Sequence, residues 1–203
     1  MTLYALKPRF QALLRPLVGR LAASGVTANQ VTVAAASGSV ALGVFLGVFL
    51  GWDDDRRLFL LVPVWLFLRM ALNAVDGMLA REFDQKSDLG AFLNELTDVV
   101  SDAALYLPFA FLPHFDWLTV SAVIFLSALS EMTGTVAVMV GAARRYDGPM
   151  GKSDRAFVFG ALGLAIGLGL QPAAWQKAIF PAIAVLLCAT IVNRVRKALA
   201  RHA

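Results

Sequence analysis

The chain has little cysteine and no segment typical of nucleic-acid binding. Its single cysteine, Cys188, excludes a disulfide framework and a cysteine-based metal site. Cys188 lies within an apolar run, where we expect it to be a small buried residue. The sequence pI is about 9.6, but no aromatic and basic RNA- or DNA-binding motif accompanies the cations. Nucleic acid is therefore not an expected partner, and anionic lipid fits the cations better.

Apolar residues dominate the chain instead. Hydrophobic residues make up 59% of the 203 residues and the mean hydropathy is +0.69, whereas an average soluble domain is about 45–50% apolar. This composition predicts an all-α integral membrane protein with a single domain over residues 1–203. A helix needs about 20 apolar residues to cross a membrane. Six segments are predicted to do so: Ala28–Gly51, Leu58–Glu82, Leu89–Phe111, Trp117–Gly141, Ala156–Leu170 and Lys177–Ala198.

The segment before the first span has a pattern of its own. Leu and Phe recur at intervals of three and four residues between Leu3 and Leu21, with Lys and Arg interleaved. This spacing predicts an amphipathic helix over residues 1–24 that lies in the headgroup plane with its apolar side toward the lipid. A helix that only packs on the bundle is the alternative. Residues 28–198 are expected to form the six-helix bundle itself.

Basic residues gather at one set of span ends. Arg56, Arg57 and Lys177 lie on one side of the predicted spans and Arg69 lies within a span. The rest of the 18 Lys and Arg residues lie on the other side. Because cations are retained on the cytoplasmic side, both termini and the polar cluster described next are expected to be cytoplasmic.

Polar and small residues recur at helical spacing inside the second and third spans. Two such faces can be read from the sequence: Arg69, Asn73, Asp76 and Ala80 on the second span, and Gly90, Asn94, Asp98 and Asp102 on the third. Since the turn between these spans is short, we expect the two helices to be antiparallel neighbours whose polar faces meet in one cleft.

Ionisable groups are costly at membrane depth, and they usually face a cavity where they handle an ion or a substrate. Carboxylate and amide oxygens on facing helices are the ligands that a hard divalent cation such as Mg²⁺ requires. A buried Arg69 also needs an acidic partner. Asp102, at matching depth, is the favoured partner, and Glu131 in the fourth span is the alternative or a support to the site.

The series D-G-x2-A-R-x8-G-x3-N-x3-D, with an Asn three residues before its first Asp, resembles a known signature. That signature, D-x2-D-G-x2-A-R-x8-G-x3-D-x3-D, belongs to the CDP-alcohol phosphotransferase (CDP-alcohol phosphatidyltransferase) family. The positions that match are Asp76, Gly77, Ala80, Arg81, Gly90 and Asp98. Six spans, an N-terminal interfacial helix and cytoplasmic termini are also what the resemblance implies.

The departures from the signature concern its charge. The family's first and third Asp are Asn73 and Asn94 here. An amide oxygen can coordinate a hard cation but brings no charge, so two negative charges are lost from a site that holds two divalent ions in the family. Glu95 and Asp102 lie near the face of Asp98 and are expected to compensate, with Glu95 as a further metal ligand. The alternative is one weakly held metal.

The resemblance implies transfer of a phosphatidyl group from CDP-diacylglycerol to an alcohol, with release of CMP and with Mg²⁺ or Mn²⁺ as cofactor. By position, Asp98 is the general base and a metal ligand. The other metal ligands are Asp76, Asn73 and Asn94. The CDP-binding positions are Gly77, Ala80, Arg81 and Gly90, with Asn29 and Thr32 at the start of the first span. The resemblance also implies a homodimer in a bacterial inner membrane.

Four cations near the link after the fourth span lie at the same membrane face as the signature: Arg144, Arg145, Lys152 and Arg155. They predict a phosphorylated acceptor, such as glycerol 3-phosphate or an inositol phosphate. Cytoplasmic retention and contact with lipid headgroups would also explain them. Serine or another alcohol is the alternative acceptor.

Three other functions are compatible with the sequence. A soluble CDP-alcohol could donate to diacylglycerol, but the small single domain favours CDP-diacylglycerol as donor. A transporter would also bury acids in its helices, but no inverted repeat is present. A catalytically impaired CDP-lipid-binding protein would fit the two Asn positions, although the expected base and the small residues are retained.

Overall fold

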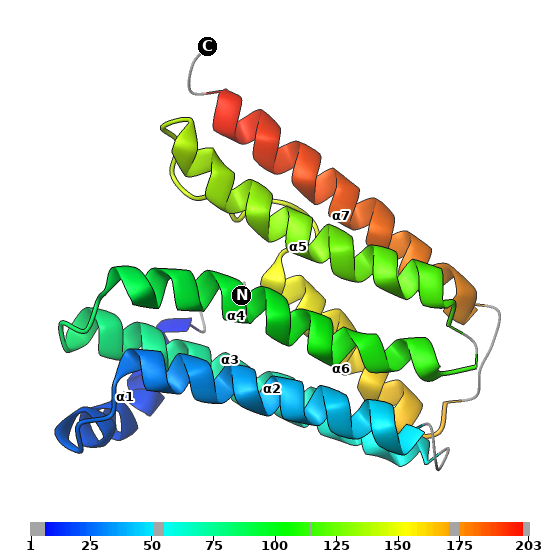
Figure 1. Ribbon diagram of the computed structural model, residues 1–203, viewed down its shortest axis with the longest axis horizontal. Coiled ribbons are helices and arrows are strands. Elements are labelled where there is room, and N and C mark those ends of the chain that lie inside the picture. The colour runs from blue at the N-terminus through cyan, green and yellow to red at the C-terminus, as the bar shows by residue number, and fades with distance from the viewer. Residues whose placement is uncertain (1–6, 51–54, 114, 171–174, 201–203) are drawn as a thin grey trace.

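The computed structural model describes residues 7–50, 55–113, 115–170 and 175–200, and within these ranges the chain is helical without a strand. The α-helices are α1 (Lys7–Ala23), α2 (Ala28–Leu50), α3 (Leu61–Glu82), α4 (Asp88–Tyr106), α5 (Trp117–Met139), α6 (Lys152–Gly167) and α7 (Trp175–Leu199). Two 3-10 helices, η2 (Arg56–Leu60) and η3 (Leu107–Phe111), precede α3 and follow α4 (Figure 1). The predicted Gly51 end of the first span and residues 1–6 lie outside the described ranges.

Four helical stretches are long and apolar enough to cross a membrane: Ala28–Leu50, Arg56–Glu82, Trp117–Met139 and Lys177–Leu199. They correspond to the first, second, fourth and sixth predicted spans, and the protein is therefore an integral membrane protein. The helices at the third and fifth predicted spans, α4 and α6, do not meet the same criteria of length and hydropathy. The sequence of α4 contains four acidic residues, and α6 is only 16 residues long.

Capping side chains fix where the helices of the site begin. The Ser87 hydroxyl accepts a hydrogen bond from the backbone N–H of Gly90 at 3.0 Å, which starts α4. The N–H of Gly151 donates to the Asp154 carboxylate at 2.9 Å, which starts α6. Between α3 and α4 the chain turns at Asp84, whose φ of 57° is left-handed. The turn therefore reverses the chain within five residues of the end of α3.

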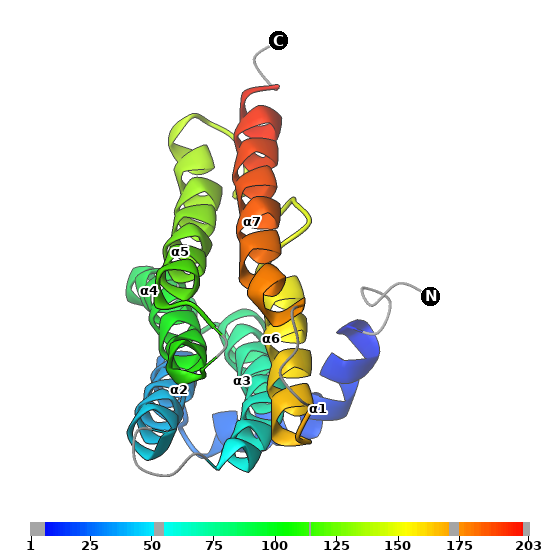
Figure 2. The ribbon, with the colours of Figure 1, turned by 90° about the vertical axis from the view of Figure 1, so that its right-hand side faces the viewer.

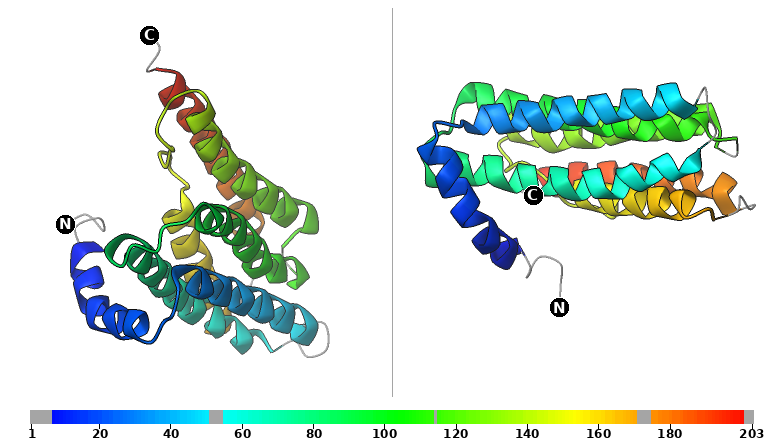
Figure 3. Two further views of the ribbon diagram at one scale, coloured as in Figure 1. Left: turned by 60° about the vertical axis from the view of Figure 1, so that its left-hand side comes forward. Right: turned by 90° about the horizontal axis from the view of Figure 1, so that it is seen from below.

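The spanning helices are arranged in two layers. One layer contains α2, α4 and α5, and the other contains α3, α6 and α7 (Figures 2 and 3). Between the layers α2 packs on α3, and α5 packs on α7. An aromatic core lies between the layers on the side away from the α3–α4 turn, where Tyr106 of α4 stacks on Phe159 of α6 with ring centroids 3.6 Å apart. The polar side chains described below lie between the same layers, nearer the turn.

The polar faces of α3 and α4 meet as predicted, since Arg69 binds Asp98 and Asp102, but the two helices do not pack closely along their backbones. Helix α2 packs closely against both of them, while the backbones of α3 and α4 approach each other hardly at all. Small residues on α2 cause this arrangement, because a Cβ at Gly43 would lie 2.2 Å from the Ala104 carbonyl oxygen of α4. Ser39 of α2 also accepts a hydrogen bond from Trp65 of α3 at 2.9 Å. Long polar side chains bridge the space that remains between α3 and α4.

Helix α1 lies across the ends of α2 and α3 (Figure 3). Its Val18 is fully buried in a cluster with Val31, Val75 and Met78 from the two spans, while Leu13 on another face is 76% exposed. The helix thus packs on the bundle with one face and exposes apolar side chains on another. An ion pair between Arg15 and Glu82, 2.9 Å long, joins α1 to the end of α3.

Cys188 corrects another prediction, because it is exposed rather than buried. Helix α7 turns Ile183, Leu187 and Thr190 toward the protein, and all three are buried. Cys188 follows Leu187 by one residue and so lies on the outer face of the helix.

Candidate functional site

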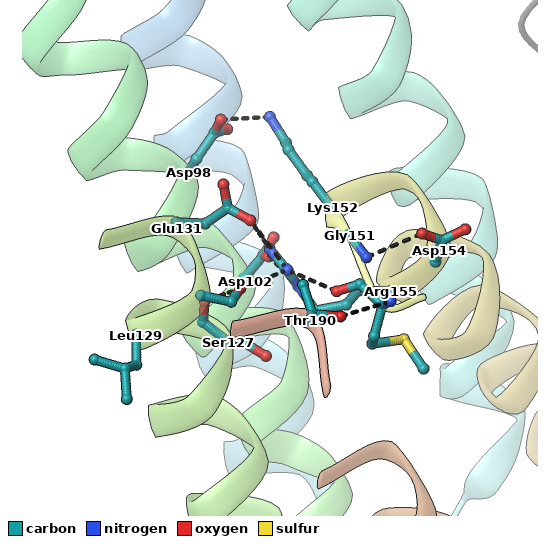
Figure 4. Close-up of polar contacts among 12 residues, drawn as sticks. Asp98, Asp102, Ser127, Leu129, Glu131, Gly151, Lys152, Asp154, Arg155 and Thr190 are labelled. Carbon is teal, nitrogen blue, oxygen red and sulfur yellow. Dashed lines mark hydrogen bonds and ion pairs between the residues drawn. The ribbon is translucent and has the colours of Figure 1, made fainter. Parts of the chain in front are cut away.

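The site begins with Asp98 on α4, the last acid of the sequence signature. Both of its carboxylate oxygens have cationic partners. Lys152 Nζ lies 2.5 Å from Oδ2 (Figure 4), and Arg69 Nη2 lies 3.1 Å from Oδ1. Lys152 is the first residue of α6 and Arg69 lies in the middle of α3. The side chain of Asp98 is 17% exposed and that of Lys152 is 34% exposed. Asp98 therefore lies at the accessible edge of a polar cluster.

Asp102, one turn further along α4, lies deeper in the same cluster. Its Oδ1 is 2.6 Å from Arg69 Nη1, and its Oδ2 is 2.9 Å from Arg155 Nη2. The same guanidinium of Arg155 reaches Glu131 of α5 at 3.1 Å. The favoured sequence-based partner of Arg69 thus contacts it, whereas Glu131, the alternative, binds other arginines. Asp102 and Arg155 are both almost fully buried.

Two further arginines meet at Glu131. Arg194 of α7 lies 3.5 Å from Glu131 Oε1, donates to the Asp147 carbonyl at 3.2 Å and also donates to the Ser130 carbonyl. Arg144, in the link between α5 and α6, lies 3.1 Å from Glu131 Oε2.

Arg144 also lies 2.6 Å from Glu95 Oε2. Burial alone would lower the pKa of the Arg144 guanidinium, but the hydrogen bond from Arg144 to Glu95 and the charge of that carboxylate raise it above the ordinary value. Glu95 is therefore bound to an arginine rather than directed at Asp98.

The sequence did not single out Arg194. It stands among several cations near the chain's last apolar segment, a pattern that cytoplasmic retention explains by itself. Its position was the one available sign of burial: within the predicted span, Arg194 lies further from the span's end than Arg196 and Lys197 do. In the structure its side chain is 1% exposed, whereas Arg196 and Lys197 are exposed.

Acids and bases in this cluster come from different layers of the fold. Asp98, Asp102 and Glu131 belong to α4 and α5, while Arg69, Lys152, Arg155 and Arg194 belong to α3, α6 and α7. The ion pairs therefore run across the interface between the two layers. We call this set, together with Arg144 and Glu95 at its edge, the interlayer network. It joins five helices and the link before α6.

A second group of predicted residues gathers where α2 begins. The Thr32 hydroxyl donates to Asp76 Oδ2 at 2.8 Å, and Asp76 is 6% exposed. None of the ion pairs among the described residues includes Asp76. Asn29, one turn before Thr32, lies against the start of α4, because a Cβ at Gly90 would be 2.8 Å from Asn29 Oδ1.

The remaining signature residues line the end of α3 and the start of α4. Arg81 is exposed and folds back over Gly77, where an added Cβ would lie 2.9 Å from its Nη2. Asn73 and Ala80 are half-buried, and Asn94 is exposed. The structure therefore brings Asn29 to Gly90 and Thr32 to Asp76, and it places Arg81 within reach of solvent.

Of the four cations predicted to bind an acceptor, two have buried atoms without a partner. Arg144 Nε, Arg144 Nη1 and Arg145 Nε make no hydrogen bond among the described residues. Lys152 is bound to Asp98, and Arg155 is enclosed by Asp102 and Glu131. Arg155 thus has no free face for an acceptor.

The comparisons with known proteins address the signature as a whole. The sequence profile of the CDP-alcohol phosphatidyltransferase family matches residues 25–195, which is most of the chain and includes every residue of the signature. The chain belongs to this family. Membership accounts for the pattern from Asp76 to Asp98 and for the small residues within it.

Two relatives and one solved structure are similar to the chain over different lengths. The Inner membrane protein YnbA of Escherichia coli strain K12 is 47% identical over 199 residues, which cover 98% of this chain and 97% of the relative. An uncharacterized protein of Aquifex aeolicus strain VF5 is 37% identical over 107 residues, or 51% of this chain and 47% of that one.

The crystal structure of Mycobacterium tuberculosis phosphatidylinositol phosphate synthase (PgsA1), in complex with manganese and citrate, shares the fold. The TM-score is 0.72 and the match covers 90% of this chain and 87% of that one, at 20% sequence identity. The two chains therefore share a fold at low sequence identity.

The donor set in this chain suits one hard cation better than two. Asp76 is a carboxylate without a cationic partner among the described residues, and Asn73, three residues earlier, lies on the same face of α3 and could add an amide oxygen. Asp98, in contrast, already has a cation on each oxygen. No group of three or more His, Cys, Asp or Glu side chains in the described part of the chain is arranged to hold a metal ion.

Proposed function

We propose that this protein transfers the phosphatidyl group of CDP-diacylglycerol to an alcohol and releases CMP. The observation that carries the proposal is the environment of Asp98, a partly exposed carboxylate at the last signature position. Arg69 and Lys152 each bind one of its oxygens, and Arg69 is held in turn by the buried Asp102. A carboxylate held in this way can accept a proton from a substrate that reaches the cluster from its open edge.

In the proposed reaction, Asp98 takes the hydroxyl proton of the acceptor. The acceptor oxygen bonds to the phosphorus of the phosphatidyl group, and the bond from that phosphorus to the bridging oxygen breaks. CMP leaves with the bridging oxygen. Each carboxylate oxygen has two lone pairs, so Asp98 can accept this proton while Arg69 stays bound. Arg69 and Asp102 hold the side chain of Asp98 in one position.

For the nucleotide we propose the region where α2 and α4 begin and α3 ends. Gly90 lets Asn29 approach the start of α4, and the exposed Arg81 can bind a phosphate with two donors. Asp76, with Asn73 and Asn94, would hold Mg²⁺ or Mn²⁺. A cation bound there would neutralise the diphosphate and make CMP a better leaving group.

The acceptor we propose is a phosphorylated alcohol of the glycerol 3-phosphate or inositol phosphate type. Support comes from Arg144 and Arg145, whose buried N–H groups lack partners among the described residues. An unpaired buried donor is costly, and a phosphate would satisfy several of them at once. Arg144 pairs with Glu95 and Glu131, and Arg145 pairs with Asp147, but each of the two keeps an N–H group without a partner among the described residues. Every guanidinium nitrogen of Arg155 has a partner and Lys152 is bound to Asp98, so the predicted acceptor set is reduced to Arg144 and Arg145.

We also propose that α4 and α6 complete a single six-span domain with α2, α3, α5 and α7, and that α1 lies at the cytoplasmic headgroup level. The excess of Lys and Arg at that side supports the orientation. The exposed Leu13 and Leu17 of α1 support its contact with lipid. The site would then open to the cytoplasm of a bacterial inner membrane, in a protein that works as a homodimer.

The deciding experiment measures CMP release from CDP-diacylglycerol by the purified protein with Mg²⁺ or Mn²⁺. The acceptor panel contains glycerol 3-phosphate, inositol phosphate, serine and plain alcohols. Asp98→Asn should lower kcat by about a hundredfold or more, as expected for loss of a general base. Asp116→Asn, which changes a helix cap on α5 away from the site, is the matched control.

Release with a phosphorylated acceptor that is lost in Asp98→Asn supports the proposal. Release only with serine or a plain alcohol would change the acceptor class, and binding of CDP-diacylglycerol without release would indicate an impaired member of the family. Arg145→Gln should raise the KM for the acceptor and leave the KM for CDP-diacylglycerol unchanged, while the exposed Arg196→Gln should change neither. Equal behaviour of the two variants would remove Arg145 from the acceptor site.

A further inference from the structure

The ammonium of Lys152 occupies a position beside the signature acids that the sequence had not indicated. Lys152 Nζ lies 2.5 Å from Asp98 Oδ2 (Figure 4). Lys152 and Asp98 are 54 residues apart in the sequence. A cation therefore lies within the signature cluster and belongs to the protein itself.

This placement is fixed from both sides. On the α6 side, Asp154 caps the helix start at Gly151, and Arg155 is held by Asp102 and Glu131. The first turn of α6 thus has little freedom. On the α4 side, Arg69 holds the other oxygen of Asp98 at 3.1 Å.

Glu95 and Asp102, the acids expected to compensate for the lost charge, both have arginine partners in the structure. Glu95 is bound to Arg144 at 2.6 Å, and Asp102 is bound to Arg69 and Arg155. The signature region therefore offers two carboxylates, Asp76 and Asp98, and two neutral amides. A pair of divalent cations would bring four positive charges against two negative ones, with Lys152 and Arg69 adding two more positive charges.

We propose that this chain holds one divalent cation, at Asp76, and that the Lys152 ammonium supplies beside Asp98 the positive charge that a second ion would otherwise bring. This inference rests on the proposed function for the substrate, a diphosphate whose charge the metal and the ammonium would share. It makes the two Asn residues and Lys152 parts of one adaptation: fewer negative charges and a resident cation.

The test counts metal ions, so it does not depend on activity. The purified protein in detergent is dialysed against Mn²⁺, and bound Mn²⁺ per chain is measured by elemental analysis and by calorimetric titration. We expect one Mn²⁺ per chain in the wild type. We expect two in the variant Asn73→Asp/Asn94→Asp/Lys152→Ala, which restores the acids and removes the ammonium.

The matched control keeps the ammonium and restores the acids: Asn73→Asp/Asn94→Asp/Lys197→Ala. Lys197 pairs with Asp147 and is half exposed, away from Asp98. In this control the second Mn²⁺ should bind about tenfold or more weakly than in the variant without Lys152, because a unit charge a few ångströms away repels the ion.

Two Mn²⁺ per chain in the wild type would overturn the inference, and so would none. Equal affinity for the second Mn²⁺ in the two triple variants would also overturn it, because Lys152 would then have no part in excluding the ion. If a triple variant does not fold, the wild-type count still decides. One Mn²⁺ per chain without any CMP release would support the inference and contradict the proposed function, so that the two can fail separately.

Discussion

Glu131 is the point at which the interlayer network can be tested most directly. Its carboxylate is 8% exposed and contacts Arg155, Arg144 and Arg194 within 3.5 Å. In Glu131→Gln, the amide has one acceptor oxygen and directs two donors toward cations. Arg155 would keep Asp102 and Arg144 would keep Glu95, but Arg194 would keep only backbone carbonyls.

The expected loss follows from this geometry. Removing one partner of a buried ion pair typically destabilises a protein by about 3–5 kcal/mol. We expect the lower end, about 3 kcal/mol, because two of the three arginines keep another acid. For a chain of this size, 1 kcal/mol corresponds to roughly 2–4 °C in Tm. Glu131→Gln should therefore lower Tm by about 6–12 °C.

The assay is thermal unfolding in detergent, followed by the fluorescence of the four tryptophans at one fixed scan rate. The matched control is Glu82→Gln, which removes the exposed partner of Arg15. Exposed ion pairs contribute little, so this control should unfold like the wild type. A Tm for Glu131→Gln within the scatter of the control would refute the reasoning.

A double-mutant cycle then identifies the cause. If the unpaired charge of Arg194 causes part of the loss, Glu131→Gln/Arg194→Gln should be less destabilised than the sum of the single variants. A coupling of about 0.5–3 kcal/mol is expected for residues in one network. Strict additivity would mean that Arg194 acts through its backbone hydrogen bonds alone.

Three further predictions concern the nucleotide end, the link after α5 and the metal. Gly90→Ala should raise the KM for CDP-diacylglycerol several-fold, because its Cβ would displace Asn29, whereas Gly19→Ala on α1 has open space and should not. A hydrogen bond from Lys197 lowers the pKa of Asp147 below its ordinary value of 3.8. The Tm advantage of the wild type over Asp147→Asn should therefore be complete above that value and disappear as the pH falls through the lowered pKa. Removal of divalent ions with a chelator should abolish CMP release, and Mn²⁺ or Mg²⁺ should restore it; release that persists in the chelator would exclude a metal requirement.

The residue spacing along single helices was enough to predict part of the site. Asp76 and Asp98 lie three or four residues from the other polar members of their faces, and such spacing aligns side chains whatever the tertiary structure is. The contact between Arg69 and Asp102 also followed from counting residues from the α3–α4 turn. Both inferences need only one helix or one turn.

Contacts that depend on a third helix could not be obtained in this way. The short turn fixes the opposite directions of α3 and α4 but not their separation, which is set by α2 through Gly43 and Ser39. Nothing local indicates that Lys152 reaches Asp98, because the position of α6 depends on its packing against α3. Hydropathy likewise could not tell which face of α7 carries Cys188, since both faces of that helix are apolar.

The two ends of the interlayer network have different roles: the buried end stabilises the fold, and the accessible end at Asp98 serves the proposed activity. The side chain of Asp102 is 6% exposed and that of Asp98 is 17% exposed. Solvent and substrate can therefore reach Asp98 but not Asp102. In apolar surroundings neither layer can keep its charges without the other, and the pairs that hold α4 and α6 together also fix Asp98. Changes at Glu131 should therefore act mainly on folding. Changes at Lys152 should act mainly on metal and substrate, because this side chain can leave Asp98 without exposing a buried charge.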